Sequence, residues 1–290
     1  MDILTQLNRA MAYIETHIDD DIALASVSSV TTYSSYHFGR LFYYIANMPL
    51  SEYIRKRKLS LAAMKLQCGC DKVIDLAVTY GYDNADSFTR AFAKQHGVTP
   101  SNARQPGVNL TIYPPLTFQI IIKGVQSMNW RIEEREAFEV FGIERIFKND
   151  ENDKVPGFWD ESFANGEYER LFTAAGAKNS EDGKHCIGAA CGYFEPDGDS
   201  FPYIICALKT PDSDTAGFRT AHIPKFTWAV FRSEASEHMG TEILNLYNKA
   251  HSEWLPSSGY DKVAGPDMEV YYDAPGGKYF QEVWIPVKRM

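Results

Sequence analysis

The sequence predicts a multi-domain protein, with an all-α tandem helix-turn-helix domain over residues 1–107 and an α+β domain of two β-α-β-β halves over residues 108–290. Three observations predict this organisation. A helix, a turn and a second helix are indicated twice near the N-terminus. After Gln105-Pro106-Gly107 the hydrophobic period changes from helical to alternating. Charge changes at the same place, from a net +1 over residues 1–107 to −10 over the remainder, within a total of −9.

The clearer of the two units lies between Val73 and Arg104. The stretch 73–78 has apolar residues on one side and is followed by a turn at Gly81-Tyr82. Asn84 offers a side-chain acceptor to the next helix, in which Phe88 and Phe92 fall on one face. The opposite face is polar. Its residues are Asp86, Ser87, Thr89, Arg90 and Lys94.

The same pattern occurs about 50 residues earlier, with a one-residue slip in the turn, where insertions cost least. Val27, Ser28, Thr32 and Tyr33 precede Leu76, Ala77, Gly81 and Tyr82 by 49 residues, and Phe38, Arg40 and Phe42 precede Phe88, Arg90 and Phe92 by 50 residues.

Around this first unit we expect a packing helix over 4–18, a cap at Ser34 or Ser35 and a connecting helix over 50–67. The buried face of the helix after the cap should hold Phe38, Leu41, Phe42 and Ile45, and its outer side Tyr36, Gly39, Arg40 and Tyr43.

The second domain is predicted from alternation and from turn residues. Strands are expected as a leading pair over 108–127, centred on 110–125, and then over 129–143, 187–194 and 203–208 around a Pro-Asp-Gly-Asp turn, 219–231, 267–272 and 279–287. Helices are expected over 155–174 and 241–254. Two β-α-β-β halves of this kind would make one sheet with helices on one side and a groove between the halves.

Composition narrows the class further. The 44% hydrophobic content indicates folded domains, and no apolar run approaches the roughly 18–20 residues of a membrane span. The first residues lack a signal-peptide pattern, and five cysteines are an odd number, so reduced thiols in the cytoplasm are expected. Cys68-Gly69-Cys70 is either a metal-binding pair or a helix-ending turn; no nearby His or second Cys pair completes a ligand set. No cofactor is expected.

The tandem unit resembles the DNA-binding module of AraC/XylS-type bacterial transcription regulators. The resemblance is carried by YSSYHFGRLFYYIANMPLSEYIRKRKLSLAAMKL and by GYDNADSFTRAFAKQHGVTPS. Three positions depart from the family pattern: Ser28, Thr32 and Ala103. The resemblance implies double-stranded DNA and RNA polymerase as partners, and base contacts at the positions of Tyr36, Gly39, Arg40, Asp86, Ser87 and Arg90.

Each DNA-binding candidate has a physical role. Arg40 and Arg90 can each bond guanine in two places or pair with a phosphate. Tyr36, Ser87, Thr89 and Lys94 suit phosphates or base edges, whereas Asp86 either accepts from cytosine or helps to cap its helix. In the basic run 55–58, Lys56 and Arg57 are expected to anchor phosphates, the alternative being a solvated helix face.

The second domain resembles the gyrase-inhibitor-like effector-binding domain, on the residues MNWRIEEREAFEVFGIE, FPYIICAL, HIPKFTWAVF and MEVYYDAPGGKYFQEVWIPVK. The order of the two domains is similar to that of the right-origin-binding type of regulator. In such domains a Glu in the last strand contacts a cationic ligand, which implies this role for Glu282. Alternation places Phe280, Glu282 and Trp284 on one face, suited to a lipophilic cation. Further candidate walls are Trp159, Tyr193, Tyr203, Trp228 and Tyr272.

The leading hypothesis is therefore a sequence-specific DNA-binding transcription regulator whose C-terminal domain senses a small, lipophilic, cationic molecule, and not an enzyme. One alternative is a hydrolase in which Glu282 works with Tyr272 or His222. Another is a DNA-binding protein with a degenerate sensor domain.

Overall fold

The computed structural model describes residues 3–69, 71–119, 128–176, 187–194 and 199–290. The chain divides into two compact units, one of Met1–Phe42 and Met48–Ile120 and one of Tyr43–Asn47 and Ile121–Met290. We call the first the helical unit and the second the sheet unit, and describe each by itself.

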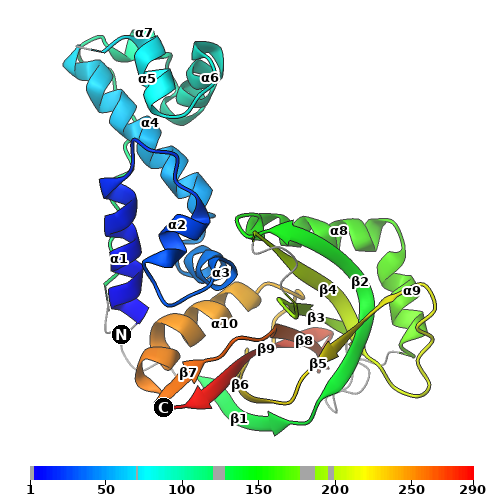
Figure 1. Ribbon diagram of the computed structural model, residues 1–290. Coiled ribbons are helices and arrows are strands. Elements are labelled where there is room, and N and C mark those ends of the chain that lie inside the picture. Colours follow the sequence, from blue (N-terminus) through cyan, green and yellow to red (C-terminus); the bar gives the residue numbers. More distant parts are fainter. Residues whose placement is uncertain (1–2, 70, 120–127, 177–186, 195–198) are drawn as a thin grey trace. The chain divides into compact units, whose positions relative to one another are not determined.

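The helical unit contains two helix-turn-helix elements joined by one long helix, as Figure 1 shows. The helices are α1 (Ile3–Thr16), α2 (Leu24–Ser29), α3 (Ser35–Ala46), α4 (Leu50–Cys68), α5 (Val73–Thr79), α6 (Ala85–His96) and α7 (Pro100–Ala103). The first element is α2–α3, the second is α5–α6, and α4 connects them. The predicted tandem arrangement is confirmed.

Local sequence explains where these helices begin and end. The Asn84 side chain accepts a hydrogen bond of 2.8 Å from the backbone N–H of Ser87, which caps α6 as predicted. Ser34 accepts from the backbone N–H of His37 at the start of α3, at 3.3 Å. Gly69 ends α4 in the left-handed conformation, with φ of 82°, so a helix-ending turn follows Cys68. Cys70 lies outside the described residues.

Aromatic residues form the core of each helix-turn-helix element. Phe38 and Phe42 are completely buried in the first, and Phe88 and Phe92 in the second. The second pair packs with residues of α4 and α5, including Leu59 and Leu76. The predicted inner faces of α3 and α6 are thereby confirmed, although Ile45 is only half-buried.

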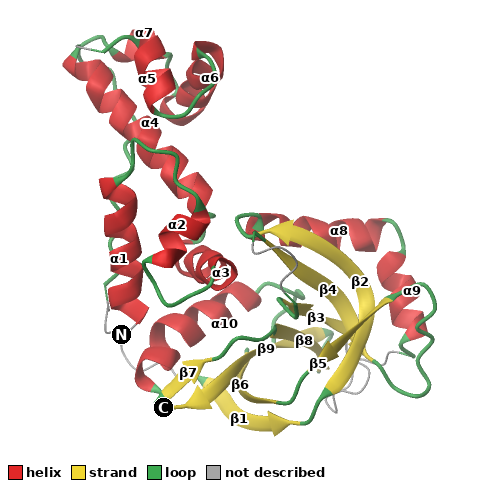
Figure 2. Cartoon of the chain, in the orientation of Figure 1, coloured by secondary structure: helices red, strands yellow, loops and turns green. Residues whose placement is uncertain are grey.

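In the sheet unit the described strands form one antiparallel sheet in the order β1-β6-β9-β8-β3-β4-β2-β5, with β7 on β9 (Figure 2). The strands are β1 (Asn129–Arg135), β2 (Phe138–Lys148), β3 (Ile187–Cys191), β4 (Ser200–Leu208), β5 (Arg219–Ile223), β6 (Phe226–Arg232), β7 (Tyr260–Lys262), β8 (Asp267–Ala274) and β9 (Lys278–Arg289). The helices are η1 (Asn152–Lys154), α8 (Val155–Ala164), α9 (Glu167–Ala174), α10 (Ile243–Lys249), η2 (Ala250–Trp254), a π-helical turn, and η3 (Leu255–Ser257).

The two β-α-β-β halves are present. One is β2, α8–α9, β3 and β4, and the other is β6, α10, β8 and β9. In each half the strand before the helix pairs with the last strand, β2 with β4 and β6 with β9, and the β3–β8 pair joins the halves.

Two long strands predicted from the sequence are each divided by a two-residue bend. Residues 129–143 form β1 and part of β2, with a break at Glu136-Ala137, and residues 219–231 form β5 and most of β6, with a break at Pro224-Lys225. In both cases the two pieces lie near opposite ends of the strand order. Because two residues span only about 7 Å, the sheet must curl to bring its ends together. Figure 2 shows this curvature.

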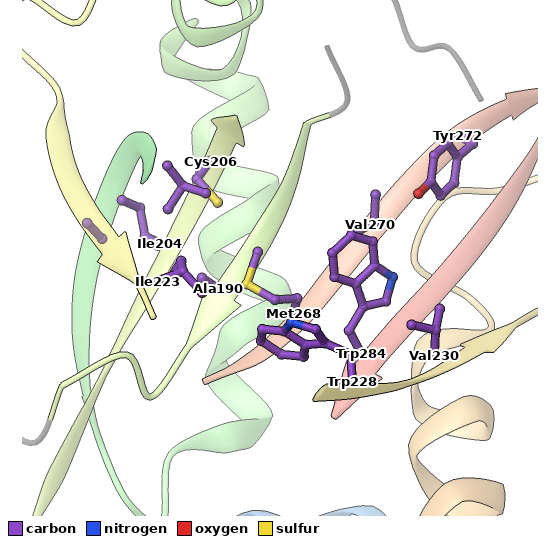
Figure 3. Packing of buried hydrophobic residues seen from close by; sticks show 12 residues of the cluster. Ala190, Ile204, Cys206, Ile223, Trp228, Val230, Met268, Val270, Tyr272 and Trp284 are labelled. Atoms are coloured by element: carbon purple, nitrogen blue, oxygen red, sulfur yellow. The ribbon is translucent and has the colours of Figure 1, made fainter. Parts of the chain in front are cut away.

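The curled sheet fills its concave face with its own side chains. A cluster on this face includes Val140, Ile204, Trp228, Met268 and Trp284, which come from β2, β4, β6, β8 and β9. Figure 3 shows Trp228 and Trp284 beside Met268, with Ile204 and Ile223 from β4 and β5.

The helices contact the other face of the sheet. Phe158 and Trp159 of α8 pack on Phe147 and Tyr271, and Trp254 of η2 packs on Phe231.

Two glycines lie where neighbouring strands approach closely. A Cβ at Gly142 in β2 would lie 1.9 Å from the Ile205 carbonyl oxygen, and one at Gly188 in β3 would lie 2.1 Å from that of Glu269. No side chain fits at either position.

The leading strands predicted over 108–127 are not found in the described part of that range, since residues 108–119 contain no strand. Residues 120–127 lie outside the described residues, as does most of the predicted Pro-Asp-Gly-Asp turn. Residues 108–119 instead follow α4, because side chains of α1 and α4 bond their backbone groups.

Candidate DNA interface and buried carboxylates

The second helix-turn-helix element presents one polar stripe. Asp86, Arg90 and Lys94 are all exposed, and their spacing of four residues aligns them along one side of α6. Ser87 and Thr89 flank the stripe and are half-buried, with the Ser87 hydroxyl donating to the Asn84 carbonyl at 2.9 Å. Asp86 lies in the first turn, where its charge complements the helix N-terminus. α6 therefore has an apolar back and a charged front.

The first element differs from this arrangement. Tyr36 and Arg40 are only 6% and 3% exposed, and Gly39 is buried as well. The prediction that these residues form an exposed outer side of α3 is wrong. Tyr36 and Arg40 lie four residues apart, and the guanidinium carbon lies 5.8 Å from the centroid of the tyrosine ring.

The four basic residues 55–58 of α4 do not all point toward the solvent. Arg55 is exposed, and half-buried Lys56 pairs with Glu52 at 2.8 Å. Arg57 is 5% exposed and Lys58, which donates to the Asp20 carbonyl, is 9% exposed. The interpretation of Arg57 as a phosphate anchor is wrong, because consecutive helical residues point in different directions and this one turns inward.

Arg57 has a structural partner in Glu15 of α1. Its Nε and Nη2 atoms donate to the two carboxylate oxygens at 2.9 and 2.6 Å. Burial opposes the charged form of Glu15, but the hydrogen bond and charge of Arg57 outweigh it, so the pKa of Glu15 lies below its usual value. The pair ties α1 to α4.

In the sheet unit, the negative charge of Glu282 is balanced by neighbouring side chains. Its carboxylate accepts from Arg131 at 2.7 and 3.2 Å, from the Trp284 indole at 2.8 Å and from the Tyr272 hydroxyl at 3.2 Å. Arg232 lies 3.7 Å away. The residue is fully buried, and the carboxylate raises the pKa of Arg131. The expectation of a carboxylate open to a cationic ligand is therefore corrected, because this charge is matched within the fold.

The predicted ligand-binding residues divide between two faces. Phe280, Trp284, Trp228, Tyr272 and Tyr193 belong to the concave cluster. Tyr193 donates a hydrogen bond to Glu144. Burial raises the pKa of the tyrosine most, and this hydrogen bond raises it further. Trp159 and Tyr203 lie instead on the helix-covered face, where the Trp159 indole donates to the Tyr203 hydroxyl at 2.8 Å. The structure does not bring the whole predicted set together.

A second buried carboxylate, Glu269 of β8, was missed by the sequence analysis. It is 6% exposed and accepts from the hydroxyls of Tyr203 and Tyr271 at 2.9 and 3.0 Å. Burial raises the pKa of both tyrosines, and the charge of Glu269 adds to this effect. A charged residue within the otherwise apolar stretch 268–272 was the available signal.

Aromatic rings connect Glu269 to the surface. Trp159 lies edge-on to Tyr271, with ring centroids 5.5 Å apart, and 6.2 Å from Phe163, which is 47% exposed. Tyr168 of α9 packs on Phe163 at 4.4 Å. Exposed carboxylates stand nearby in sequence on the same helices, at Asp160, Glu161 and Glu169.

Within the described residues, no group of three His, Cys, Asp or Glu side chains is placed to hold a metal ion. None of the described helices combines the length and the hydropathy needed to cross a membrane. Among the described cysteines, Cys68, Cys191 and Cys206 are not joined in disulfide bonds.

Known proteins match the two units separately. The GyrI-like small molecule binding domain family matches residues 128–288, and a helix-turn-helix domain family matches residues 27–106. Regulatory protein SoxS of Escherichia coli strain K12 is 34% identical over 94 residues, which are 32% of this chain and 88% of SoxS. The right origin-binding protein of the same strain is 32% identical over 105 residues, 36% of each chain. That match therefore spans about a third of the relative's length.

Among solved structures, SAV2435 bound to tetraphenylphosphonium aligns with 56% of this chain and 94% of its own, with a TM-score of 0.45 and 19% identity. The family match over 128–288 covers more than half of the sequence. The chain thus belongs to the GyrI-like small-molecule-binding family, and it carries an AraC-type helix-turn-helix domain ahead of that domain.

Proposed function

We propose that this protein is a sequence-specific DNA-binding transcription regulator whose sheet unit senses a small lipophilic cation beside Glu269. As a regulator of this type it would also contact RNA polymerase. The DNA-binding part is supported by the exposed stripe on α6, and the sensing part by the aromatic residues around a buried carboxylate.

The α6 stripe suits the major groove. The groove admits one helix, and side chains on a single face reach base edges and phosphates together. Arg90 is at the centre of the stripe, between Asp86 and Lys94, and is exposed. It is the residue that we assign to base recognition, while Lys94 is assigned to the phosphate backbone.

The α3 helix is a weaker candidate for the groove. Arg40 is 3% exposed, whereas Arg90 at the matching position of α6 is exposed. We therefore assign sequence reading to α6 and give the first element a supporting role.

Glu269 supports a cationic ligand through its surroundings. The Glu269 carboxylate accepts hydrogen bonds from Tyr203 and Tyr271, and Trp159 lies edge-on to Tyr271 beside it. A cation placed beside Glu269 would gain from the negative charge and from the faces of Trp159 and Tyr271. The net charge of −10 after residue 107 also attracts cations.

The hydrolase alternative is not favoured. Arg131, Trp284 and Tyr272 all donate to Glu282, which makes it a poor general base. His222 lies exposed on β5, opposite Glu139 of β2. Incubation with ester and epoxide substrates, followed by product analysis, tests this alternative.

Two experiments test the proposed function. Bound sequences are selected from a random duplex pool with the full chain, and a single recovered motif is expected. Binding of tetraphenylphosphonium is then measured by calorimetry for the wild type, Glu269→Gln and Glu282→Gln, with triphenylphosphine oxide as a neutral comparison.

Glu269→Gln is expected to weaken binding of the cation about tenfold or more and to leave binding of the neutral compound within about twofold. In Glu282→Gln the ratio of the two affinities should stay at the wild-type value. Equal losses for both compounds in Glu269→Gln would remove the charge from ligand recognition. Failure to recover any motif would overturn the DNA-binding part.

A further inference from the structure

Residues 108–119, which we call the strap, lie just outside the helix-turn-helix family match at 27–106. They contain no helix or strand, yet they belong to the helical unit. An extended segment of this kind must find hydrogen-bond partners for its backbone groups. Here the partners are side chains of α1 and α4.

The bonds follow α4 in reverse order. Gln67 donates to the Val108 carbonyl at 3.3 Å, the Tyr113 N–H donates to Ser60 at 2.9 Å, and Arg57 donates to the Tyr113 carbonyl at 2.6 Å. The Leu116 N–H then donates to the Tyr53 hydroxyl at 2.9 Å. The strap therefore runs antiparallel to α4 over most of its length.

The far end of the strap is held by α1. The Asn8 amide nitrogen donates to the Phe118 carbonyl, and the Phe118 N–H donates to the Asn8 oxygen, each at 2.9 Å. One side chain thus reproduces the paired hydrogen bonds of a strand ladder.

The strap touches both helix-turn-helix cores. Leu110 packs against the cluster that contains Phe88 and Phe92. Phe118 lies edge-on to Phe42 of the first element, at 6.3 Å and 84°. The eight residue steps from Val108 to Leu116 can reach about 26 Å when extended, and the fourteen steps of α4 from Tyr53 to Gln67 rise about 21 Å, so the strap is long enough to follow the helix between these contacts.

Glu15, Tyr53 and Arg57 join the strap to both helices in one network. Tyr53 donates to Glu15 at 3.0 Å while accepting from the strap, and Arg57 bonds Glu15 and the strap at once. Burial raises the pKa of Tyr53 to about 12, so the hydroxyl keeps its proton at neutral pH. The network is composed of groups that do not change charge under ordinary conditions.

We propose that the strap is a splint that fixes the orientation of the two helix-turn-helix elements, and that detachment from its Phe118 end loosens them. A single helix joining two elements can bend, but a second connection alongside it resists bending. The chain continues from Phe118 toward the GyrI-like domain at 128, so this end is the one that the domain can reach through the chain. The effect on DNA rests on the proposed function, whereas the mechanical role does not.

The test uses the full chain with the double substitution Asn8→Leu and Tyr53→Phe. The two changes remove three hydrogen bonds to the strap backbone, two at Phe118 and one at Leu116. Tyr113→Phe is the matched control, because it removes a hydroxyl from the strap itself that makes none of these bonds. Hydrogen exchange of residues 108–119 is measured first. The amides of Tyr113, Leu116 and Phe118 should be protected from exchange about 100-fold in the wild type. In the double variant the protection of Leu116 and Phe118 should fall about tenfold.

The second measurement is the distance distribution between spin labels at Ser29→Cys and Ser101→Cys, in a chain with Cys68, Cys70 and Cys186 replaced by Ser and with the buried Cys191 and Cys206 kept. The distribution should be narrow in the wild type and in Tyr113→Phe, and broad in the double variant. Affinity for the selected duplex should fall about tenfold in the double variant. Tyr53→Phe alone, which removes the acceptor for the Leu116 N–H, provides the same test at that amide if the double variant does not fold.

Unprotected strap amides in the wild type, or an unchanged distance distribution in the variant, would overturn the splint. Arg90→Ala separates the two proposals, because it should lower DNA affinity without changing exchange or distances. If no duplex is bound by the wild type, the proposed function fails while exchange and distances still decide the splint.

Discussion

The Arg131 guanidinium meets the Glu282 carboxylate through two hydrogen bonds, although β6 lies between their strands in the sheet. Arg131 is 43% exposed along its side chain and Glu282 only 1%. The pair therefore covers the buried carboxylate with a partly solvated arginine. This arrangement satisfies the charge of Glu282 without burying two ions completely.

Glu282→Gln should lower the free energy of unfolding of the sheet unit by about 2 kcal/mol, because Arg131 loses its partner and two other donors lose a charged acceptor. All five tryptophans lie between residues 130 and 284, so urea unfolding followed by tryptophan fluorescence reports this unit. Glu161→Gln removes an exposed partner of Arg145 and should cost less than about 0.5 kcal/mol. Similar losses in the two variants would contradict this.

Arg90→Ala should weaken binding of the selected duplex by about 2 kcal/mol and reduce its preference over random duplex, because a base contact is lost. Lys56→Ala should weaken both duplexes alike, since a lysine that meets only phosphates carries no sequence information. Fluorescence anisotropy at one fixed salt concentration measures both. An equal loss on the two duplexes for Arg90→Ala would show that this arginine does not read bases.

His96 of α6 makes the helical unit sensitive to acid. It is 6% exposed, and burial lowers its pKa below the usual 6.5, even though the Leu59 carbonyl lies 3.2 Å from Nε2. The unfolded chain therefore binds the proton more readily, and stability that is present above pH 6.5 is lost as the pH falls below it.

Circular dichroism at 222 nm, followed during urea unfolding between pH 7.5 and 5, measures this dependence in the helical unit. His96→Gln should flatten it, whereas exposed His222→Gln should leave it unchanged. A wild-type unit that gains stability on acidification over this range would show that the sign is wrong.

Gly142→Ala should destabilise the sheet unit by about 3 kcal/mol, because its Cβ would lie 1.9 Å from a carbonyl oxygen of the neighbouring strand. Gly157 of α8 is exposed, with open space around its Cβ position, and Gly157→Ala should stabilise by up to about 1 kcal/mol through helix propensity. Tryptophan fluorescence again gives the unfolding curve. Loss of stability in both variants would mean that steric contact at Gly142 is not the cause.

The sequence was sufficient for features set by local chemistry. The Asn84 cap, the Phe88 and Phe92 face and the Gly69 helix end each depend on residues a few positions apart. The order of the β-α-β-β halves also follows from hydrophobic period. These features were predicted correctly because no distant partner decides them.

Features set by distant partners were not predictable. Arg57 resembles a surface residue until Glu15, 42 residues earlier, is placed beside it. The bend at Glu136-Ala137 has no Gly or Pro to mark it, and only the curl of the sheet requires it. Glu269 was passed over because the sequence does not show that Tyr203 and Tyr271 meet it.

The inward direction of Arg57 and Lys58 affects how strongly DNA affinity should depend on ionic strength. Each phosphate that a protein neutralises contributes about 0.9 to the logarithmic slope of affinity against salt. Because two of the four cations in the run 55–58 are occupied by Glu15 and the Asp20 carbonyl, they release no counterions from a duplex. Titration with potassium chloride should therefore give a slope shallower by about two units than the basic run suggests.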